Sequence, residues 1–101
     1  MRVIIVRVGK KPLIEDIPED RKSIKKILGG IIEPHHPYKD RSIVVLTSPE
    51  SEEVNRWIVD ENGQSKFIVK GNFILCKEDA MQHYCGFTAG EAVQWKKELE
   101  R

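Results

Sequence analysis

The sequence predicts one small α+β domain over residues 1–101, with a mixed or antiparallel sheet of five to six strands and two main helices on one face. Three observations carry this prediction. Residues 67–76 are the densest apolar run of the second half, Asn62-Gly63 is a strong hairpin signal, and Thr88 with Glu91 matches a capping box. A chain of 101 residues has the length of one domain with one core.

The first third of the chain predicts a hairpin followed by a helix. Residues 3–8 and 13–17 are apolar strand candidates, and the connection between them has hairpin length, so we expect them to pair antiparallel. Pro12 indicates that the second of them lies at an edge of the sheet. Apolar residues at helical spacing then predict a helix over residues 19–28, which Gly29-Gly30 would end in a left-handed cap.

Short strands and turns are predicted in the middle of the chain. Residues 31–33 and 43–46 are strand candidates, and the two prolines and polar residues of 34–41 predict a loop between them. Ser48-Pro49 resembles a helix start with proline at the first helical position. We therefore expect one or two helical turns after residue 48.

The most apolar stretch follows a predicted hairpin. Residues 57–59 and 66–69 flank Asn62-Gly63 and predict a strand, a tight turn and a second strand. The second arm leads into residues 67–76, which we interpret as the central strand region, buried on both faces. Gly71 interrupts this run and is expected at a bulge or at a positive φ.

The chain ends in a predicted helix over residues 89–100. The Thr88 hydroxyl can accept from the amide of Glu91, whose carboxylate can reach back to the amide of Thr88. An apolar face at helical spacing, expected to close over the sheet, consists of Ala92, Trp95 and Leu99.

Composition excludes several classes of protein. The formal net charge of +1 is too small for a protein that binds duplex nucleic acid through a basic excess. Apolar runs fall short of the roughly 18 residues that cross a bilayer, so we expect no membrane partner and a soluble, cytoplasmic protein. Cys76 and Cys85 are too few for a disulfide framework and predict free thiols.

Cysteines and histidines raise two chemical alternatives. Cys76, His83 and Cys85, with His35 or His36, could supply zinc ligands, but their spacing lacks the short clips of structural zinc sites. His35 and His36 could act in acid–base chemistry with Tyr38, Asp40 or Glu33 as partner. A complete catalytic motif is missing from the sequence, so we expect no enzyme, no cofactor and no metal, and solvated histidines.

The residues expected to bind a ligand are polar or basic groups outside the predicted core. The Arg56 guanidinium could hold a phosphate or carboxylate beside Asn55, whereas the alternative is that Asn55 turns the backbone and Arg56 pairs with Glu52 or Glu53. A basic band at residues 21–26 offers a phosphate contact, against its interpretation as a solvated helix face. The full candidate set is Asn55, Arg56, His35, His36, Tyr38 and Lys25.

Five segments along the chain recur in one family of small proteins. They are Leu28-Gly29-Gly30-Ile31-Ile32-Glu33, Val54-Asn55-Arg56-Trp57, Glu61-Asn62-Gly63, Gly71-Asn72-Phe73-Ile74-Leu75-Cys76 and Gly86-Phe87-Thr88. Together they resemble the domain-of-unknown-function family 3846 over nearly the whole chain, although the loop at 34–41, with its two histidines, departs from the usual pattern. The resemblance implies a setting in bacteriophages, plasmids and bacterial genomes, and it implies no activity.

These observations predict a non-catalytic binding protein of a phage or mobile element. We expect it to counteract a host defence by sequestering an anionic, nucleotide-like small molecule, and to form a homo-oligomer with pockets at its interfaces. One alternative is an interaction module that inhibits or regulates a host protein through an exposed sheet edge or an apolar patch near Trp57 and Trp95. A weaker alternative is a small histidine-dependent hydrolase.

Overall fold

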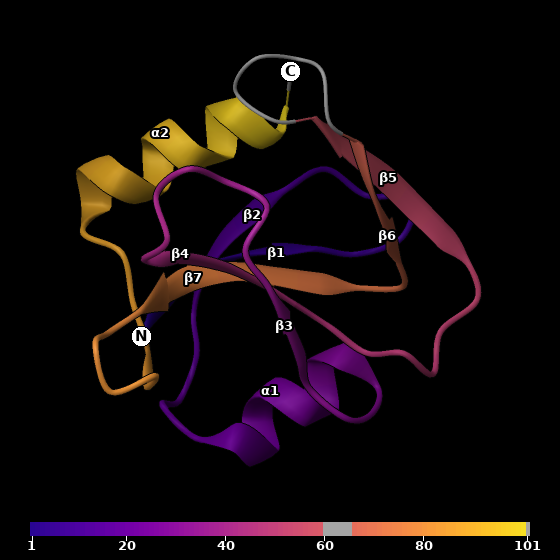
Figure 1. The fold of residues 1–101 in the computed structure, drawn as a ribbon, viewed down its shortest axis with the longest axis horizontal. Helices are drawn as coiled ribbons and strands as arrows, with labels where there is room; N and C mark the ends of the chain where they lie inside the picture. Colours follow the sequence, from indigo (N-terminus) through magenta and orange to yellow (C-terminus); the bar gives the residue numbers. More distant parts are fainter. Residues whose placement is uncertain (60–65, 101) are drawn as a thin grey trace.

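The computed structural model of the chain describes residues 1–59 and 66–100 (Figure 1). These residues form two helices and eight strands, which confirms the α+β class. None of the described helices has the length and apolar character needed to cross a membrane. In chain order the elements are β1 (Arg2–Val6), β2 (Leu13–Asp16), α1 (Arg21–Leu28), β3 (Glu33–His35), β4 (Ile43–Thr47), β5 (Val54–Val59), β6 (Lys66–Lys70), β7 (Phe73–Glu78), β8 (Tyr84–Cys85) and α2 (Ala89–Leu99).

The main sheet has six strands, and β7 lies near its middle. The strand order is β2-β1-β7-β4-β3, and β8 pairs with the end of β7. Every pair is antiparallel, including the predicted hairpin of β1 and β2, with β2 at the expected edge. The first four residues of β7 are completely buried, because both of its faces are covered.

The two helices cover opposite faces of this sheet. Ile24 of α1 packs in a core with Val3 and Ile5, whereas Ala92 of α2 packs with Ile4 and Val6. Successive residues of a strand point to opposite faces, so this alternation places α1 below the sheet and α2 above it (Figure 1). The expectation of both helices on one face was therefore wrong. β1 and β4 are apolar on both sides, and each side needs its own cover.

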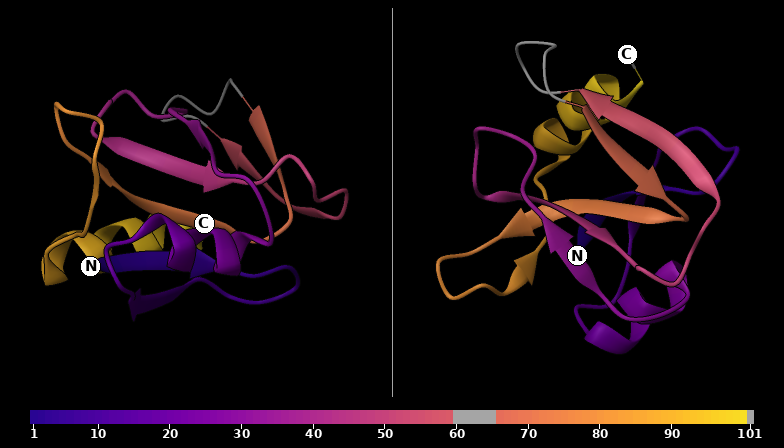
Figure 2. Two further views of the ribbon diagram at one scale, coloured as in Figure 1. Left: turned by 90° about the horizontal axis from the view of Figure 1, so that it is seen from below. Right: turned by 45° about the vertical axis from the view of Figure 1, so that its right-hand side comes forward.

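A separate two-stranded ribbon, formed by β5 and β6, shares the α2 side of the sheet (Figure 2). Ile58 and Val69 on its inner face belong to the same core as Ala92 and Leu99. The ribbon and α2 therefore close this face together.

Gly71 divides the run that we interpreted as one central strand region. Its φ of +75° confirms the predicted left-handed conformation, and its amide donates to the Glu53 carbonyl at 2.7 Å. A Cβ at this position would lie 2.5 Å from the Ser51 Cβ. The chain turns here and leaves the ribbon for the main sheet, so residues 67–76 contribute to two sheets rather than to one strand.

Two further expectations in the middle of the chain were wrong. Strand β3 begins at Glu33 and includes His35, so the strand lies two residues later than predicted and one histidine leaves the expected loop. Residues 49–50 form a turn, and residues 48–53 contain no helix, so the chain crosses to β5 without the expected helical turns. The predicted Asn62-Gly63 turn lies outside the described residues.

The helix ends follow local sequence signals. The Asp20 side chain accepts from the amide of Ser23 at the start of α1, and Gly29 ends that helix with a φ of +83°. Thr88 and Glu91 form both bonds of the predicted capping box at the start of α2.

Candidate functional site

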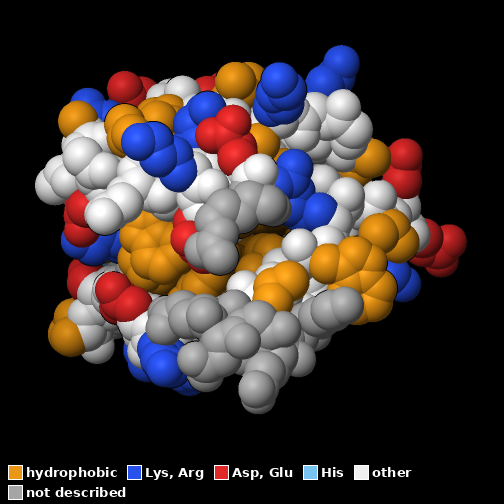
Figure 3. Space-filling model, turned by 90° about the horizontal axis from the view of Figure 1, so that it is seen from above, with side chains coloured by type: hydrophobic (Ala, Val, Ile, Leu, Met, Phe, Trp, Pro, Cys, Tyr) orange, Lys and Arg blue, Asp and Glu red, His pale blue; other side chains and the backbone are white. Residues whose placement is uncertain are grey.

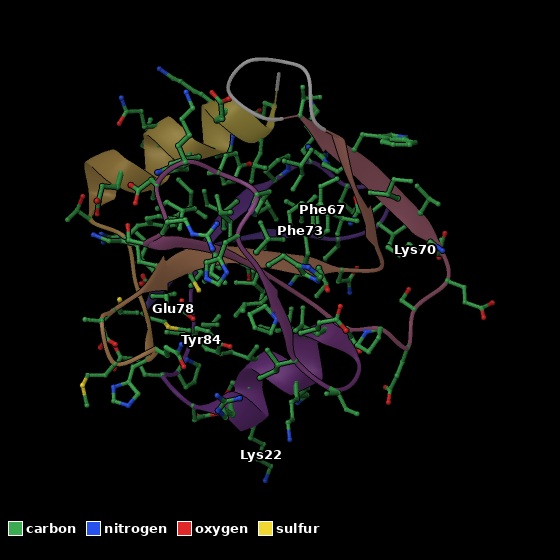
Figure 4. The ribbon with its side chains drawn as sticks, in the orientation of Figure 1. Lys22, Phe67, Lys70, Phe73, Glu78 and Tyr84 are labelled. Carbon is green, nitrogen blue, oxygen red and sulfur yellow. The ribbon has the colours of Figure 1, made fainter. Side chains whose placement is uncertain are left out.

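A polar hollow of about 350 Å³ lies between the edge strand β3, the loop at 48–53 and strand β6. Figure 4 labels Phe67 and Lys70, which bring an aromatic ring and a cation to it from β6. Among the described residues β6 pairs only with β5, so its other edge borders the hollow. The lining consists of Glu33, His35, Thr47, Ser48, Pro49, Ser51, Glu52, Phe67, Ile68 and Lys70.

His35 is the most constrained polar group of the hollow. Its Nε2 lies 3.1 Å from Thr47 Oγ1 and 3.2 Å from Glu33 Oε1. The Thr47 hydroxyl donates to the Glu33 carbonyl at 3.5 Å, so its oxygen accepts from Nε2–H. The ring also contacts that of Phe67, with 4.6 Å between centroids and a 47° tilt.

Burial shifts the acid–base behaviour of this imidazole. Desolvation lowers the pKa of His35 below its ordinary value, the negative charge of Glu33 acts in the opposite direction, and His36 adds a smaller lowering effect. At neutral pH the side chain is therefore a neutral hydrogen-bonding group and not a cation.

The geometry around His35 does not form a catalytic triad. In such a triad the carboxylate and the nucleophile bond to different ring nitrogens, so that one nitrogen orients the base and the other takes the proton. Glu33 and Thr47 both lie against Nε2. The arrangement fixes the ring without preparing it to abstract a proton from Thr47.

The floor of the hollow is held by close packing. Thr47 and Ser48 are buried, with exposed fractions of 7% and 4%. Ser48 Oγ accepts from the amide of Glu50 at 3.4 Å. A Cβ on Gly30 would meet the Glu50 carboxylate and lie 2.7 Å from Ser48 Oγ, so the loop packs closely against residue 30 as well as against Gly71. These contacts set the shape of the floor.

The rim combines one cation with groups that accept hydrogen bonds. Lys70 is exposed at the end of β6, and Ser51 adds a hydroxyl. Glu33 and Glu52 supply carboxylates. A ligand that carries both an anionic group and hydrogen-bond donors would find a partner for each.

Only His35, of the six candidate ligand residues, lines this hollow. The neighbouring His36 turns away, and its Nε2 lies 2.8 Å from Glu78 Oε1. Tyr38 is buried in the α2 core, with its ring edge-on to Trp95 at 4.7 Å between centroids. Lys25 is exposed on α1, which covers the opposite face of the sheet.

Asn55 and Arg56 have structural partners in the backbone. Asn55 Nδ2 donates to the Val6 carbonyl at 3.0 Å and to the Gly71 carbonyl at 2.8 Å. Arg56 Nη1 donates to the Leu99 carbonyl at the end of α2, in place of the expected pairing with Glu52 or Glu53. Its buried Nε has no partner in the described part of the chain. A direct ligand role for these two residues stays a prediction.

The basic band and the cysteines lie elsewhere. Arg21 stacks over the Tyr84 ring, 5.5 Å from its centroid, beside a second hollow of about 330 Å³. Burial raises the pKa of the Cys76 thiol far above its ordinary value, and Cys85 is a free, half-buried thiol on β8. Within residues 1–59 and 66–100, His, Cys, Asp and Glu side chains form no cluster arranged to hold a metal ion.

Sequence reasoning missed most of the hollow. Thr47, Ser48 and Ser51 lie in one stretch of the chain and Phe67 and Lys70 in another, and only the tertiary fold brings the two together. One signal was available, because Lys70 ends the apolar run 67–69 and a lysine is rarely buried, which predicts that its side chain points to solvent.

The chain is thus a small α+β domain whose antiparallel sheet bears a helix on each face and a β-ribbon beside one of them. It belongs to a family described as a domain of unknown function (DUF3846), whose model matches residues 1–100. This match confirms the resemblance seen in the sequence. Neither a curated protein nor a solved structure shows a significant match to the chain.

Proposed function

We propose that this chain is a non-catalytic binding protein of a phage or mobile element, which sequesters an anionic, nucleotide-like small molecule in the hollow beside His35 and so counteracts a host defence. The observation that carries the proposal is the meeting of Lys70, the Ser51 hydroxyl and the Phe67 ring around one hollow. The family resemblance supplies the phage and plasmid setting.

The size and chemistry of the hollow suit such a ligand. Its volume of about 350 Å³ lies at the lower end of the roughly 300–1,000 Å³ of ligand pockets. Lys70 would bind a phosphate group, and Glu33 and Glu52 would accept from the amino or hydroxyl groups of a base and sugar. The Phe67 ring offers an apolar wall to the base.

The same geometry favours binding over hydrolysis. The hydrogen bond from His35 to Thr47 leaves the histidine as a donor toward that hydroxyl rather than as its base, and Thr47 is almost completely buried. His36 is engaged with the Glu78 carboxylate. Among the described residues, the hydroxyl that bonds to His35 is therefore poorly placed to act as a nucleophile, which supports binding over the hydrolase alternative.

Isothermal titration against a panel of cyclic and linear nucleotides tests the proposal. We expect heat of binding with at least one nucleotide, and a loss of about 10-fold or more in affinity for Lys70→Glu, because the charge-assisted bond becomes a repulsion. Lys22→Glu is the matched control, since Lys22 is an exposed lysine of α1 at the far side of the molecule (Figure 4). It should bind as the wild type does.

Two outcomes would contradict the proposal. An absence of heat with every nucleotide would refute the small-molecule function and favour the host-protein alternative. Conversion of any nucleotide by the purified chain, detected by chromatography of the titrated sample, would refute the non-catalytic claim.

A further inference from the structure

The outer face of the β5–β6 ribbon carries a row of exposed apolar side chains, here called the ribbon stripe. It consists of Val54, Trp57 and Val59 of β5 and Ile68 of β6, whose exposed fractions are 53%, 55%, 40% and 41%. Trp57 and Ile68 lie directly opposite each other in the strand register. Figure 3 shows hydrophobic side chains gathered on the ribbon side of the molecule, at the right of the view.

The ribbon has one buried face and one exposed face. Its inner residues Ile58 and Val69 are buried in the α2 core, whereas its outer apolar residues remain exposed and no described helix or strand packs over them. Two-stranded sheets gain little stability by themselves, and a contiguous apolar patch on such a sheet is typical of an interaction surface.

The ribbon stripe is continuous with the hollow beside His35. Ile68 belongs to both, and Lys70, two residues further along the same face of β6, also lines the hollow. A protein that covers the stripe therefore also covers part of the open side of the hollow.

We infer that this cover is a second copy of the chain, packed ribbon to ribbon about a two-fold axis. A two-fold interface uses one patch on both copies, so the patch must be complementary to itself. One end of the ribbon stripe meets this condition, because Lys70 is paired with Val54 across the ribbon, and Glu52 and Glu53 directly precede Val54.

The charges at this end are available for such an interface. The side chains of Lys70, Glu52 and Glu53 form no ion pair within the described part of the chain. The two-fold arrangement places Lys70 of each copy against the acidic pair of the other, twice per dimer. A net charge of +1 does not oppose association of two copies. If the proposed function holds, the second copy also supplies the wall that the hollow lacks.

Sedimentation velocity of the ligand-free protein over a range of concentrations tests the dimer. We expect a concentration-dependent dimer for the wild type, and association weakened about 10-fold or more in Trp57→Glu, which places a charge in the centre of the apolar contact. The matched control is Met81→Glu, because Met81 is 75% exposed in the loop between β7 and β8. This control should dimerise as the wild type does, and circular dichroism should show that all variants are folded.

A charge swap provides the second test and does not depend on the tolerance of position 57. Lys70→Glu should weaken the dimer through repulsion from Glu52 and Glu53, and adding Glu52→Lys and Glu53→Lys to the same chain should restore it. A wild type that stays monomeric at every concentration, or a triple variant that associates no better than Lys70→Glu, would overturn the inference. Both readouts are made without ligand, so they are distinct from the nucleotide titration that tests the proposed function.

Discussion

Asn55 in β5 and Val6 in β1 connect the ribbon to the main sheet. Asn55 Nδ2 donates to the Val6 carbonyl at 3.0 Å, and its second hydrogen reaches the Gly71 carbonyl at 2.8 Å. One amide thus satisfies two carbonyl groups that lie where the two sheets meet. The neighbouring Asn72 acts in the same way, since its Oδ1 accepts from the amide of Val8 and its Nδ2 donates to the Ile27 carbonyl.

The first prediction is that Asn55→Leu destabilises the fold without changing its overall architecture. The substitution removes a donor from each of two part-buried hydrogen bonds, and a buried acceptor left without a partner costs about 1–3 kcal/mol. Urea denaturation should therefore show a decrease of at least about 1 kcal/mol in the free energy of unfolding. Gln94→Leu, on an exposed position of α2, is the matched control for loss of an amide and should change little. Equal effects of the two substitutions would contradict the bridging role.

The second prediction separates backbone strain from steric conflict at two glycines with nearly the same φ. Gly9 and Gly71 have φ values of +73° and +75°, but a Cβ meets nothing within 4 Å at Gly9 and meets Ser51 at 2.5 Å at Gly71. Gly9→Ala should cost about 1 kcal/mol through its left-handed backbone alone. Gly71→Ala should cost more, because residues 51 and 71 must move apart. Thermal or urea unfolding of both variants measures the difference, and equal losses would show that the approach of Ser51 is unimportant.

The parts of the fold that the sequence predicted are those fixed by local chemistry. Gly29, Thr88 and Glu91 act on backbone groups within a few residues of themselves, so these helix ends are readable from the chain, whereas α1 begins two residues later than predicted, with Asp20 as its N-cap. The full burial of the first half of β7 followed from its unbroken apolar composition.

The parts that the sequence did not predict depend on contacts between distant segments. The sequence identified Gly71 as a special backbone position. It did not predict that the chain passes from one sheet to the other there, because this depends on contacts of Gly71 with the loop at residues 48–53. The hollow is assembled by the pairing of Glu33 with Thr47 and by the contact between His35 and Phe67. Residue types alone drew attention to Arg56, whose guanidinium in the fold binds the end of α2.

The third prediction concerns the start of α2. Thr88→Ala removes the hydroxyl that accepts from the Glu91 amide at 3.2 Å, and loss of such a cap costs about 1 kcal/mol. Thr88→Ser keeps the oxygen and should retain most of the stability. Urea denaturation of the two variants checks the assignment. A loss below a few tenths of a kcal/mol for the alanine variant would mean that another group caps this helix.

The last prediction is a pH dependence of stability that arises from His35. Desolvation lowers its pKa in the folded state below the 6.5 of the unfolded chain, so the unfolded state binds more protons between these two values. The stabilisation that comes from the neutral imidazole is therefore fully present above about pH 6.5. The free energy of unfolding should decrease as the pH falls below 6.5, and this decrease should stop once the pH is below the pKa of His35 in the folded state. Urea denaturation of the wild type and of His35→Gln, each at pH 7.5 and at pH 5, measures this contribution. The carboxyl groups with lowered pKa values titrate below this pH range, and they are those of Asp20, Asp40, Asp79 and Glu91. The glutamine variant keeps a hydrogen-bond donor near Thr47 but cannot titrate, so its stability should change less between the two pH values. An identical change in both proteins would show that His35 is as easily protonated in the fold as in the unfolded chain.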